Sequence, residues 1–104
     1  KSESLPARER IMQARGVQAK RFRDANRNIS TNSEMNARDI ATIMKISDDV
    51  KEILNRSARA LDLSARSYHK IIKLARTIAD LDSSLEIYPR HILEAISYRP
   101  KQQY

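Results

Sequence analysis

The sequence has no cysteine, no tryptophan and a single glycine, Gly16. Without cysteine the chain can form no disulfide, no cysteine-ligated zinc site and no cysteine nucleophile. With one glycine it can form neither the GxxxxGK(S/T) loop nor the GxGxxG loop, which bind nucleotide phosphates in many folds. The two histidines, His69 and His91, match no HExxH zinc motif. We therefore expect that these 104 residues are not an enzyme by themselves.

Aromatic residues are also scarce, at 5% of the sequence, and apolar runs are only a few residues long. A core made from such a sequence is mostly aliphatic and rich in alanine, which favours packed helices. No run is long enough to span a membrane, and no secretory signal is visible. These features predict a cytoplasmic chain with no membrane partner. Because the sequence starts at Lys1 rather than at methionine, we expect a piece of a longer protein.

Positive charge, in contrast, is abundant: 20 lysines and arginines against 13 acids give a net charge of +7. This excess suits a polyanionic partner such as nucleic acid, nucleotide phosphates or an acidic protein surface. It also keeps many ordinary small domains in solution. Residues 1–28 hold eight of the basic residues and three acids, whereas residues 29–104 are nearly balanced. We therefore divide the chain into a basic leading helix, 1–28, and a helical domain, 29–104.

Apolar residues spaced by three and four predict an all-α bundle of about five helices. The leading helix is expected over residues 6–26, followed by a polar loop at 28–35. The strongest amphipathic pattern covers residues 65–82, and Pro100 is expected to end the last helix. The later helices are expected to start at cap residues or at proline: Asn36, Ser47, Ser64 and Pro89.

Each predicted helix has an inward face. The positions assigned to these faces are Ile11, Ala14, Gln18, Phe22 and Ala25; Ile40, Ile43 and Met44; Val50, Ile53, Leu54 and Leu61; Ile71, Leu74, Ala75, Ile78 and Leu81; and Ile92, Leu93 and Ile96. The apolar stripe of the leading helix is thin, so this helix is expected to lie along the domain rather than at its centre. Glycine in a helix costs about 1 kcal/mol relative to alanine, so Gly16 marks either a close contact or a flexible point.

The polar face of residues 65–82 carries a stripe of cations that could contact phosphates. It consists of Arg66, Lys70 and Lys73, followed by Thr77 and Asp80. The alternative is an ordinary solvated helix face. Arg66 differs from the lysines because it falls in the first turn, where unpaired N–H groups and the helix dipole favour an anion. A cation there is locally unfavourable unless an anion or a carboxylate is its partner.

Other residues with reactive or stacking side chains form no obvious site. The tyrosines, Tyr68, Tyr88, Tyr98 and Tyr104, lack the spacing of base-stacking RNA-binding motifs. His69 and His91 are expected to be cap or surface residues, with no metal bound. The carboxylates are isolated or lie at helix starts, so no general acid and base pair is apparent.

The stretch LSARSYHKIIKLARTIADL, residues 63–81, resembles the C-terminal signature of the bacterial Mg-chelatase-like AAA+ ATPases, the ComM-type competence proteins. Ser67 and Lys70 replace the family's usual alanine and arginine. The resemblance extends over nearly the whole chain. Further matching positions are Arg8, Glu9, Arg10, Ile11, Ala14, Arg15, Gln18, Arg21, Phe22, Asn36, Ala37, Ile87, His91, Ile92, Glu94, Ala95, Tyr98 and Arg99.

The resemblance implies a part of a larger machine, a helical lid of the AAA+ type with a long leading helix. In this family a Lon-like domain and an AAA+ core with Walker motifs precede the lid. The parent protein is expected to be an ATPase that uses ATP and Mg²⁺, with none bound by the fragment alone. Its implied partners are the AAA+ core of the same chain, neighbouring subunits of a homo-oligomeric ring, and DNA, since the family is associated with moving branched DNA during recombination.

The resemblance also assigns roles to particular arginines. Arg66 matches the sensor-2 position, from which an arginine reaches the nucleotide phosphates when the lid closes, in its own subunit or in a neighbour. Arg59 and Arg76 are weaker candidates that internal salt bridges would also explain. The candidates for contacts with phosphate, DNA or another subunit are Arg8, Arg10, Arg15, Lys70, Lys73 and Arg76.

Two other functions fit the residues. The first is a basic DNA-binding module that uses the leading helix and the Arg66, Lys70 and Lys73 face, which predicts a steep salt dependence of binding. The second is an interaction scaffold whose charges only keep it soluble. Such a scaffold would respond to no nucleotide or DNA.

Overall fold

The computed structural model describes residues 6–98, which form five α-helices and a 3-10 turn, with no strand in this range. The prediction of an all-α bundle of about five helices is therefore confirmed. The predicted stop at Pro100 lies outside the described residues. The elements are α1 (Ala7–Asp24), η2 (Asn32–Glu34), α2 (Ala37–Ile43), α3 (Asp48–Leu61), α4 (Ala65–Leu81) and α5 (Pro89–Ser97).

Polar caps start three of these helices at the predicted residues. Asn36 accepts a hydrogen bond from the Asp39 N–H, and Asp39 accepts one from the Asn36 N–H in return. Ser47 and Ser64 each accept from the N–H of the third residue of α3 and α4. Each cap pairs an N–H group that the helix itself leaves unpaired. These local signals explain why the helix starts were predictable.

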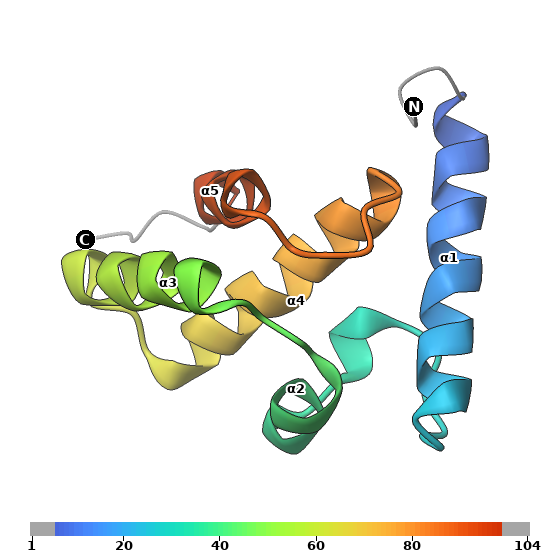
Figure 1. Cartoon of the computed structure of the whole chain (residues 1–104), viewed down its shortest axis with the longest axis horizontal. Helices are drawn as coiled ribbons and strands as arrows, with labels where there is room; N and C mark the ends of the chain where they lie inside the picture. Colours follow the sequence, from blue (N-terminus) through green and yellow to red (C-terminus); the bar gives the residue numbers. More distant parts are fainter. Residues whose placement is uncertain (1–5, 99–104) are drawn as a thin grey trace, which may run out of the picture.

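Helix α4 lies at the centre of the fold (Figure 1). Helices α1, α2 and α5 and the turn η2 all pack against it, and α3 packs against α5. Ala75 and Ala79 of α4 are fully buried, and their small side chains allow close approach of the neighbouring elements. The core consists of Phe22, Met35, Ile40, Met44, Val50, Leu54, Ile71, Ile72, Ala75, Ala79, Ile87, Ile92 and Ala95.

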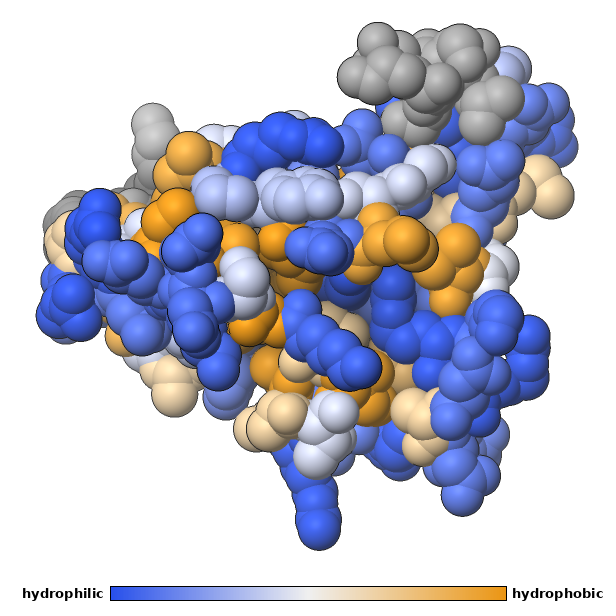
Figure 2. All heavy atoms as spheres, in the orientation of Figure 1, coloured by the Kyte–Doolittle hydropathy of each residue, from blue (hydrophilic) through white to orange (hydrophobic). Residues whose placement is uncertain are grey.

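The leading helix packs against the bundle through a thin stripe, as predicted. Its buried residues are Ala14, Gln18 and Phe22, whereas Ile11 and Ala25, both predicted to face inward, are exposed. Gly16 makes no close contact, since a Cβ added there would meet no atom within 4 Å. Hydrophilic side chains cover most of α1, while apolar side chains reach the surface along the segment that joins α4 to α5 (Figure 2).

Three further positions differ from the predicted faces. Leu61 is exposed because it lies in the last turn of α3, where it borders a pocket instead of entering the core. Leu93 is 58% exposed because Ile92 and Ala95 already supply the inward face of the short helix α5. Asp80, expected on the solvent face of α4, is only 4% exposed. Two charged partners, Arg21 of α1 and Arg76 of the same helix, explain its burial.

Candidate functional site

The fold brings the predicted cation stripe of α4 to one cavity. Arg66, Lys70 and Lys73 follow one another along the same face of the helix at intervals of four and three residues. With His69, they line a cavity of about 340 Å³. None of the described residues that line this cavity is acidic. Its other wall is formed by residues at the start of α2: Met35, Asn36, Ala37 and Ile40.

Arg66 has the setting of an anion-binding side chain. It is exposed in the first turn of α4, and this turn contains no acidic residue. Within residues 6–98 its guanidinium has no hydrogen-bond or ion-pair partner. Ser64 caps one N–H of the turn, and the remaining N–H groups favour a negative charge nearby. The arrangement can therefore bind an anion between the helix start and the guanidinium.

The two lysines of the stripe differ from each other. Lys73 is half-buried, and its ammonium donates a hydrogen bond to the carbonyl oxygen of Ser33 at 3.2 Å, which links α4 to η2. Lys70 is exposed and makes no such contact within the described part of the chain. Lys73 thus has a structural contact in addition to its place at the cavity, whereas the ammonium of Lys70 is open to solvent.

Arg76 occupies a different environment from the rest of the predicted candidates. It is 6% exposed, and its guanidinium lies 3.1 Å from the Asp80 carboxylate. It also donates to the carbonyl oxygens of Leu85 and Ser84, at 3.0 and 2.6 Å. Burial lowers the pKa of Arg76, and the charge of Asp80 acts in the opposite direction. Of the two interpretations of Arg76, the structure shows the internal salt bridge. Its Nε atom is unpaired in the described structure but buried, so it is not exposed to an external phosphate.

Asp80 is the centre of a polar network that joins α1, η2 and α4. Arg21 binds both of its carboxylate oxygens, at 2.7 and 2.9 Å. Asn32, fully buried in η2, donates to the same carboxylate at 2.9 Å, and its own N–H donates to the side chain of Gln18. The apolar periodicity and charge pattern of the sequence did not predict this network. The only local signal was the spacing of four residues between Arg76 and Asp80, which places them on one helix face.

The other candidate residues in α1 remain at the surface. Arg8 and Arg15 are exposed, and Arg10 is half-buried, with its Nε atom buried and unpaired in the described structure. Arg59, in the last turn of α3, is exposed as well. None of these side chains lines the cavity beside Arg66. The structure thus separates a surface set in α1 from the stripe in α4.

The two predicted histidine roles diverge. His91 is fully buried, and its Nδ1 accepts a hydrogen bond from the Tyr88 N–H at 2.9 Å, which caps the start of α5. Its Nε2 lies 3.4 Å from the Asp82 carboxylate. Burial lowers the pKa of His91. The cap role is confirmed for His91, while His69 is partly buried beside the cation stripe.

Comparison with known proteins identifies the class of this helical domain. Residues 1–99 match the family described as the C-terminal part of magnesium chelatase subunit ChlI, and the chain belongs to this family. It is 33% identical over 96 residues to the competence protein ComM of Haemophilus influenzae. It is also 33% identical over 96 residues to an uncharacterized protein, YifB, of Escherichia coli. No solved structure matches.

The chain corresponds to a small part of these relatives. Each of the two alignments covers 92% of this chain but 18% of the relative. Within the described residues, no helix is long and apolar enough to cross a membrane. The same residues contain no group of three histidines or carboxylates that could hold a metal ion. The family match and the alignments together show that the chain is a C-terminal domain of a Mg-chelatase-like protein of the ComM type.

Proposed function

We propose that this domain is the helical lid of a Mg-chelatase-like AAA+ ATPase and that Arg66 senses the bound nucleotide. The observation that carries the proposal is the setting of Arg66. It is an exposed guanidinium without a partner in the described structure, at a helix start that favours anions, beside a cavity lined by two further cations. Membership of the family supplies the AAA+ context.

The chemistry of the site suits a nucleotide triphosphate. A guanidinium presents paired N–H groups that match two phosphate oxygens. Placed at the γ-phosphate, Arg66 stabilises the charge that develops during phosphoryl transfer, and the loss of that phosphate releases the lid. Lys70 lies one turn further along the same face and adds positive charge. The nucleotide is held either by the same subunit or by a neighbour.

Mg²⁺ belongs to the catalytic core in this proposal. The cavity beside Arg66 has no carboxylate among its described lining residues, so these residues fit the phosphates of ATP but not a hard divalent cation. The AAA+ core of the same chain would hold Mg²⁺ and the reacting phosphates. We further propose a cytoplasmic parent that assembles as a homo-oligomeric ring and acts on DNA during recombination.

The test is DNA-stimulated ATP hydrolysis by the full-length protein, with and without Arg66→Ala. A hydrogen bond to a charged group is worth about 1.5–3 kcal/mol, so hydrolysis should fall by about 10- to 100-fold. Arg56→Ala is the matched control, since Arg56 is an exposed helical arginine in an exposed ion pair with Glu52. Unchanged hydrolysis by a folded Arg66→Ala protein would contradict the sensor role.

A DNA-binding module is the second candidate, because Arg8, Arg15 and Arg23 of α1 are exposed and unpaired among the described residues. This function predicts tight binding of duplex DNA by the 104-residue chain, with log Kd rising steeply with log salt concentration. The Arg8→Ala/Arg15→Ala variant should then bind less tightly at every sequence tested. Binding that disappears near physiological salt would reject this candidate.

A further inference from the structure

A second groove adjoins the cavity that carries the cation stripe, and it lies between α2, α4 and the start of α3. The two share the side chains of Ala37, Ile40 and His69. This α2–α4 groove has a volume of about 470 Å³, within the range of about 300–1,000 Å³ that ligand sites occupy. Its lining includes the core residues Ile40, Met44 and Ile72, so its floor is apolar.

The charged residues that line the α2–α4 groove are basic. Lys45, in the linker from α2 to α3, and Lys51, in α3, are exposed and have no side-chain partner among residues 6–98. His69 of α4 is partly buried beside them. Asp48 and Asp49 lie between the two lysines in the sequence but do not line the groove. The groove therefore combines an apolar floor with a positive edge.

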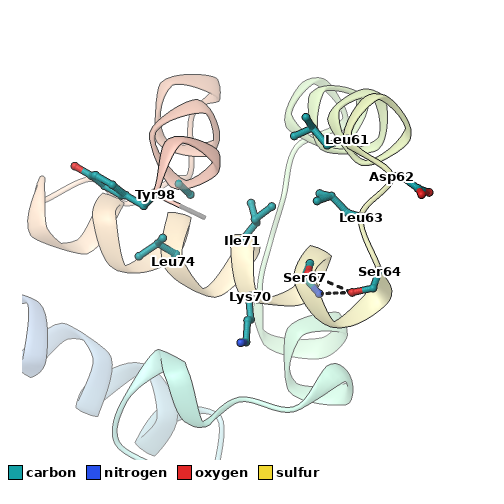
Figure 3. A pocket seen from close by; sticks show the side chains of 10 residues that line it. Leu61, Asp62, Leu63, Ser64, Ser67, Lys70, Ile71, Leu74 and Tyr98 are labelled. Atoms are coloured by element: carbon teal, nitrogen blue, oxygen red, sulfur yellow. Dashed lines mark hydrogen bonds between the residues drawn. The ribbon is translucent and has the colours of Figure 1, made fainter. Parts of the chain in front are cut away.

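Two other pockets of the domain include an acid. The pocket between α3, α4 and α5 contains Asp62 beside Leu61 and Leu63, and Figure 3 shows Lys70 directed away from these leucines. The pocket between the α2–α3 linker and the α4–α5 segment contains Glu86. Residues 29–104 carry twelve basic residues and ten acids. The basic lining of the α2–α4 groove therefore does not follow from composition alone.

Contacts within the domain fix the walls of this groove. The Tyr68 hydroxyl donates a hydrogen bond to the Asn55 side chain at 2.9 Å, which joins α4 to α3 along one side. On the other side, Ala37 and Ala41 of α2 are exposed, and their side chains are too short to fill the groove. A preformed groove lowers the entropy cost of docking.

The surroundings of the groove select the class of its occupant. Residues 6–98 contain no strand, so they offer no sheet edge to which an extended segment could add. A docking segment must then satisfy its own backbone hydrogen bonds while it presents apolar side chains, which an amphipathic helix does. The positive edge favours a helix with carboxylates beside its apolar stripe, because complementary charges orient partners and disfavour others.

We propose that an acidic amphipathic helix of the parent's own AAA+ core docks in the α2–α4 groove. Its apolar side chains pack on Ile40, Met44 and Ile72, and its carboxylates lie beside Lys45 and Lys51. The alignment with ComM covers 18% of that protein, so about four-fifths of such a relative lies outside this chain. A tethered segment has a high effective concentration, which favours the same chain over a separate partner.

This inference rests on the AAA+ parent proposed above and identifies the surface through which its core contacts the lid. Neither Arg66 nor Lys70 lines the α2–α4 groove. A failure of the docking contact would therefore leave the hydrolysis result of Arg66→Ala standing.

A synthetic peptide tests the charge of the groove. The probe is a fluorescein-labelled peptide with leucine at intervals of three and four residues and glutamate on the other helix face. Fluorescence anisotropy follows its binding to the 104-residue chain. Lys45→Glu/Lys51→Glu should weaken binding by about tenfold, because two attractive contacts become repulsive.

Arg8→Glu/Arg15→Glu is the matched control for that variant. It makes the same change of charge at two exposed residues of α1 outside the groove. Screening by physiological salt should keep its effect on binding below about twofold. Equal weakening by the two double variants would overturn the proposal, since the peptide would then respond only to net charge.

Ala41→Lys separates docking from attraction by net charge. The substitution adds a cation but places a long side chain in the groove, and thermal unfolding checks that this exposed position tolerates it. Docking predicts severalfold weaker binding of the probe, whereas net charge predicts tighter binding. Ala60→Lys, exposed in α3 outside the groove, is the control and should bind at least as tightly as the natural chain. Tighter binding by Ala41→Lys would overturn the proposal.

The full-length protein tests the source of the helix. If its own core fills the groove, it should bind the probe about tenfold more weakly than the 104-residue chain. The core expressed without this domain should also displace the probe from the 104-residue chain. Equal binding by the full-length protein would overturn the proposal. An apparent affinity that falls as the 104-residue chain is concentrated would also overturn it, because a second copy would then be the occupant.

Discussion

The two ends of α4 use the same residue types in opposite ways. At the first end, Arg66 and Lys70 are exposed and have no partners within the described structure. Toward the C-terminal end, Arg76 and Asp80 are almost fully buried and pair with each other. Asp80 also binds Arg21 of α1. One helix therefore carries a set of charges that joins the elements of the fold and a set that the fold leaves free.

The difference follows from what the neighbouring elements supply. Around Asp80, α1 contributes a guanidinium and η2 contributes the amide of Asn32, so removal from water is compensated by hydrogen bonds. Around Arg66 the neighbouring wall contains Met35 and Ile40 but no carboxylate among its described residues. Removing one partner from such a buried network leaves an uncompensated charge and destabilises the fold, whereas the free charges at Arg66 are available for a ligand.

The largest expected effect is that of Asp80→Ala on stability. The substitution leaves Arg21 and Arg76 facing each other without their carboxylate, and breaking a buried pair costs about 3–5 kcal/mol. Because the Arg21 side chain retains 16% exposure, we expect a loss near the lower end, about 3 kcal/mol. Urea unfolding followed by circular dichroism would measure this loss.

Glu52→Ala is the control for that measurement. It breaks an ion pair of the same chemistry with Arg56, but both side chains are more than 60% exposed. Surface pairs contribute at most about 1 kcal/mol, so the control should change stability little. Similar losses in the two variants would show that solvent screens the Asp80 network, and the proposed division between the ends of α4 would fail.

The next effect is a loss of stability in mild acid, caused by the buried imidazole of His91 beside Asp82. Burial lowers the pKa of His91 in the folded chain below its unfolded value of about 6.5. Asp82 raises this pKa, while Arg90 and Arg76 lower it further. The unfolded chain therefore takes up the proton first as the pH falls. Stability should be fully present above about pH 6.5 and decrease below it, as measured by thermal unfolding between pH 8 and 5.

His91→Gln assigns this pH dependence to the imidazole. A glutamine at the third helical position can still accept from the N–H that precedes the helix, but it does not titrate. The variant should lose some packing yet show a flatter dependence of its free energy of unfolding on pH. A slope as steep as that of the natural chain would assign the acid sensitivity to the carboxylates, such as Asp39, whose pKa the bonded Arg27 lowers.

The sequence predicted what depends on neighbours along the chain and missed what depends on tertiary partners. Helix starts at Asn36, Ser47 and Ser64 were predictable because a cap bonds within three residues. Asp80 was not, because its partner Arg21 lies 59 residues away and only the packing of α1 onto α4 brings the two together. Leu93 was misplaced for a related reason, since periodicity does not say how much of a short apolar face the neighbours cover.

The candidate site also combines features that helical spacing predicts with features that depend on tertiary packing. The first-turn position of Arg66 and its common face with Lys70 and Lys73 follow from helical spacing alone. The cavity opposite them does not, because α2 and the residues before it form its other wall. The burial of Arg76 was also not decided by spacing. Its interaction with the carbonyl oxygens of the α4–α5 segment depends on how that segment folds back.

A smaller effect is expected at α1, the helix whose Arg21 binds Asp80 of α4. Gly16 lies on the exposed side of α1, and a Cβ there meets no atom within 4 Å. Gly16→Ala should therefore stabilise the chain by up to about 1 kcal/mol, the difference in helix propensity. The stabilised chain should keep the same pH profile. Destabilisation by Gly16→Ala, measured by urea unfolding, would show that α1 needs a flexible point there.

The smallest expected effect belongs to Arg66→Ala in the 104-residue chain. No partner within the described structure is lost, and removing a cation from a helix start relieves an unfavourable dipole interaction worth about 0.3–1 kcal/mol. The free energy of unfolding should therefore stay the same or rise slightly, while hydrolysis by the full-length protein falls. A loss of several kcal/mol would mean that Arg66 supports the fold as Arg76 does. The two ends of α4 would then not differ in role, and reduced hydrolysis could no longer be assigned to nucleotide sensing.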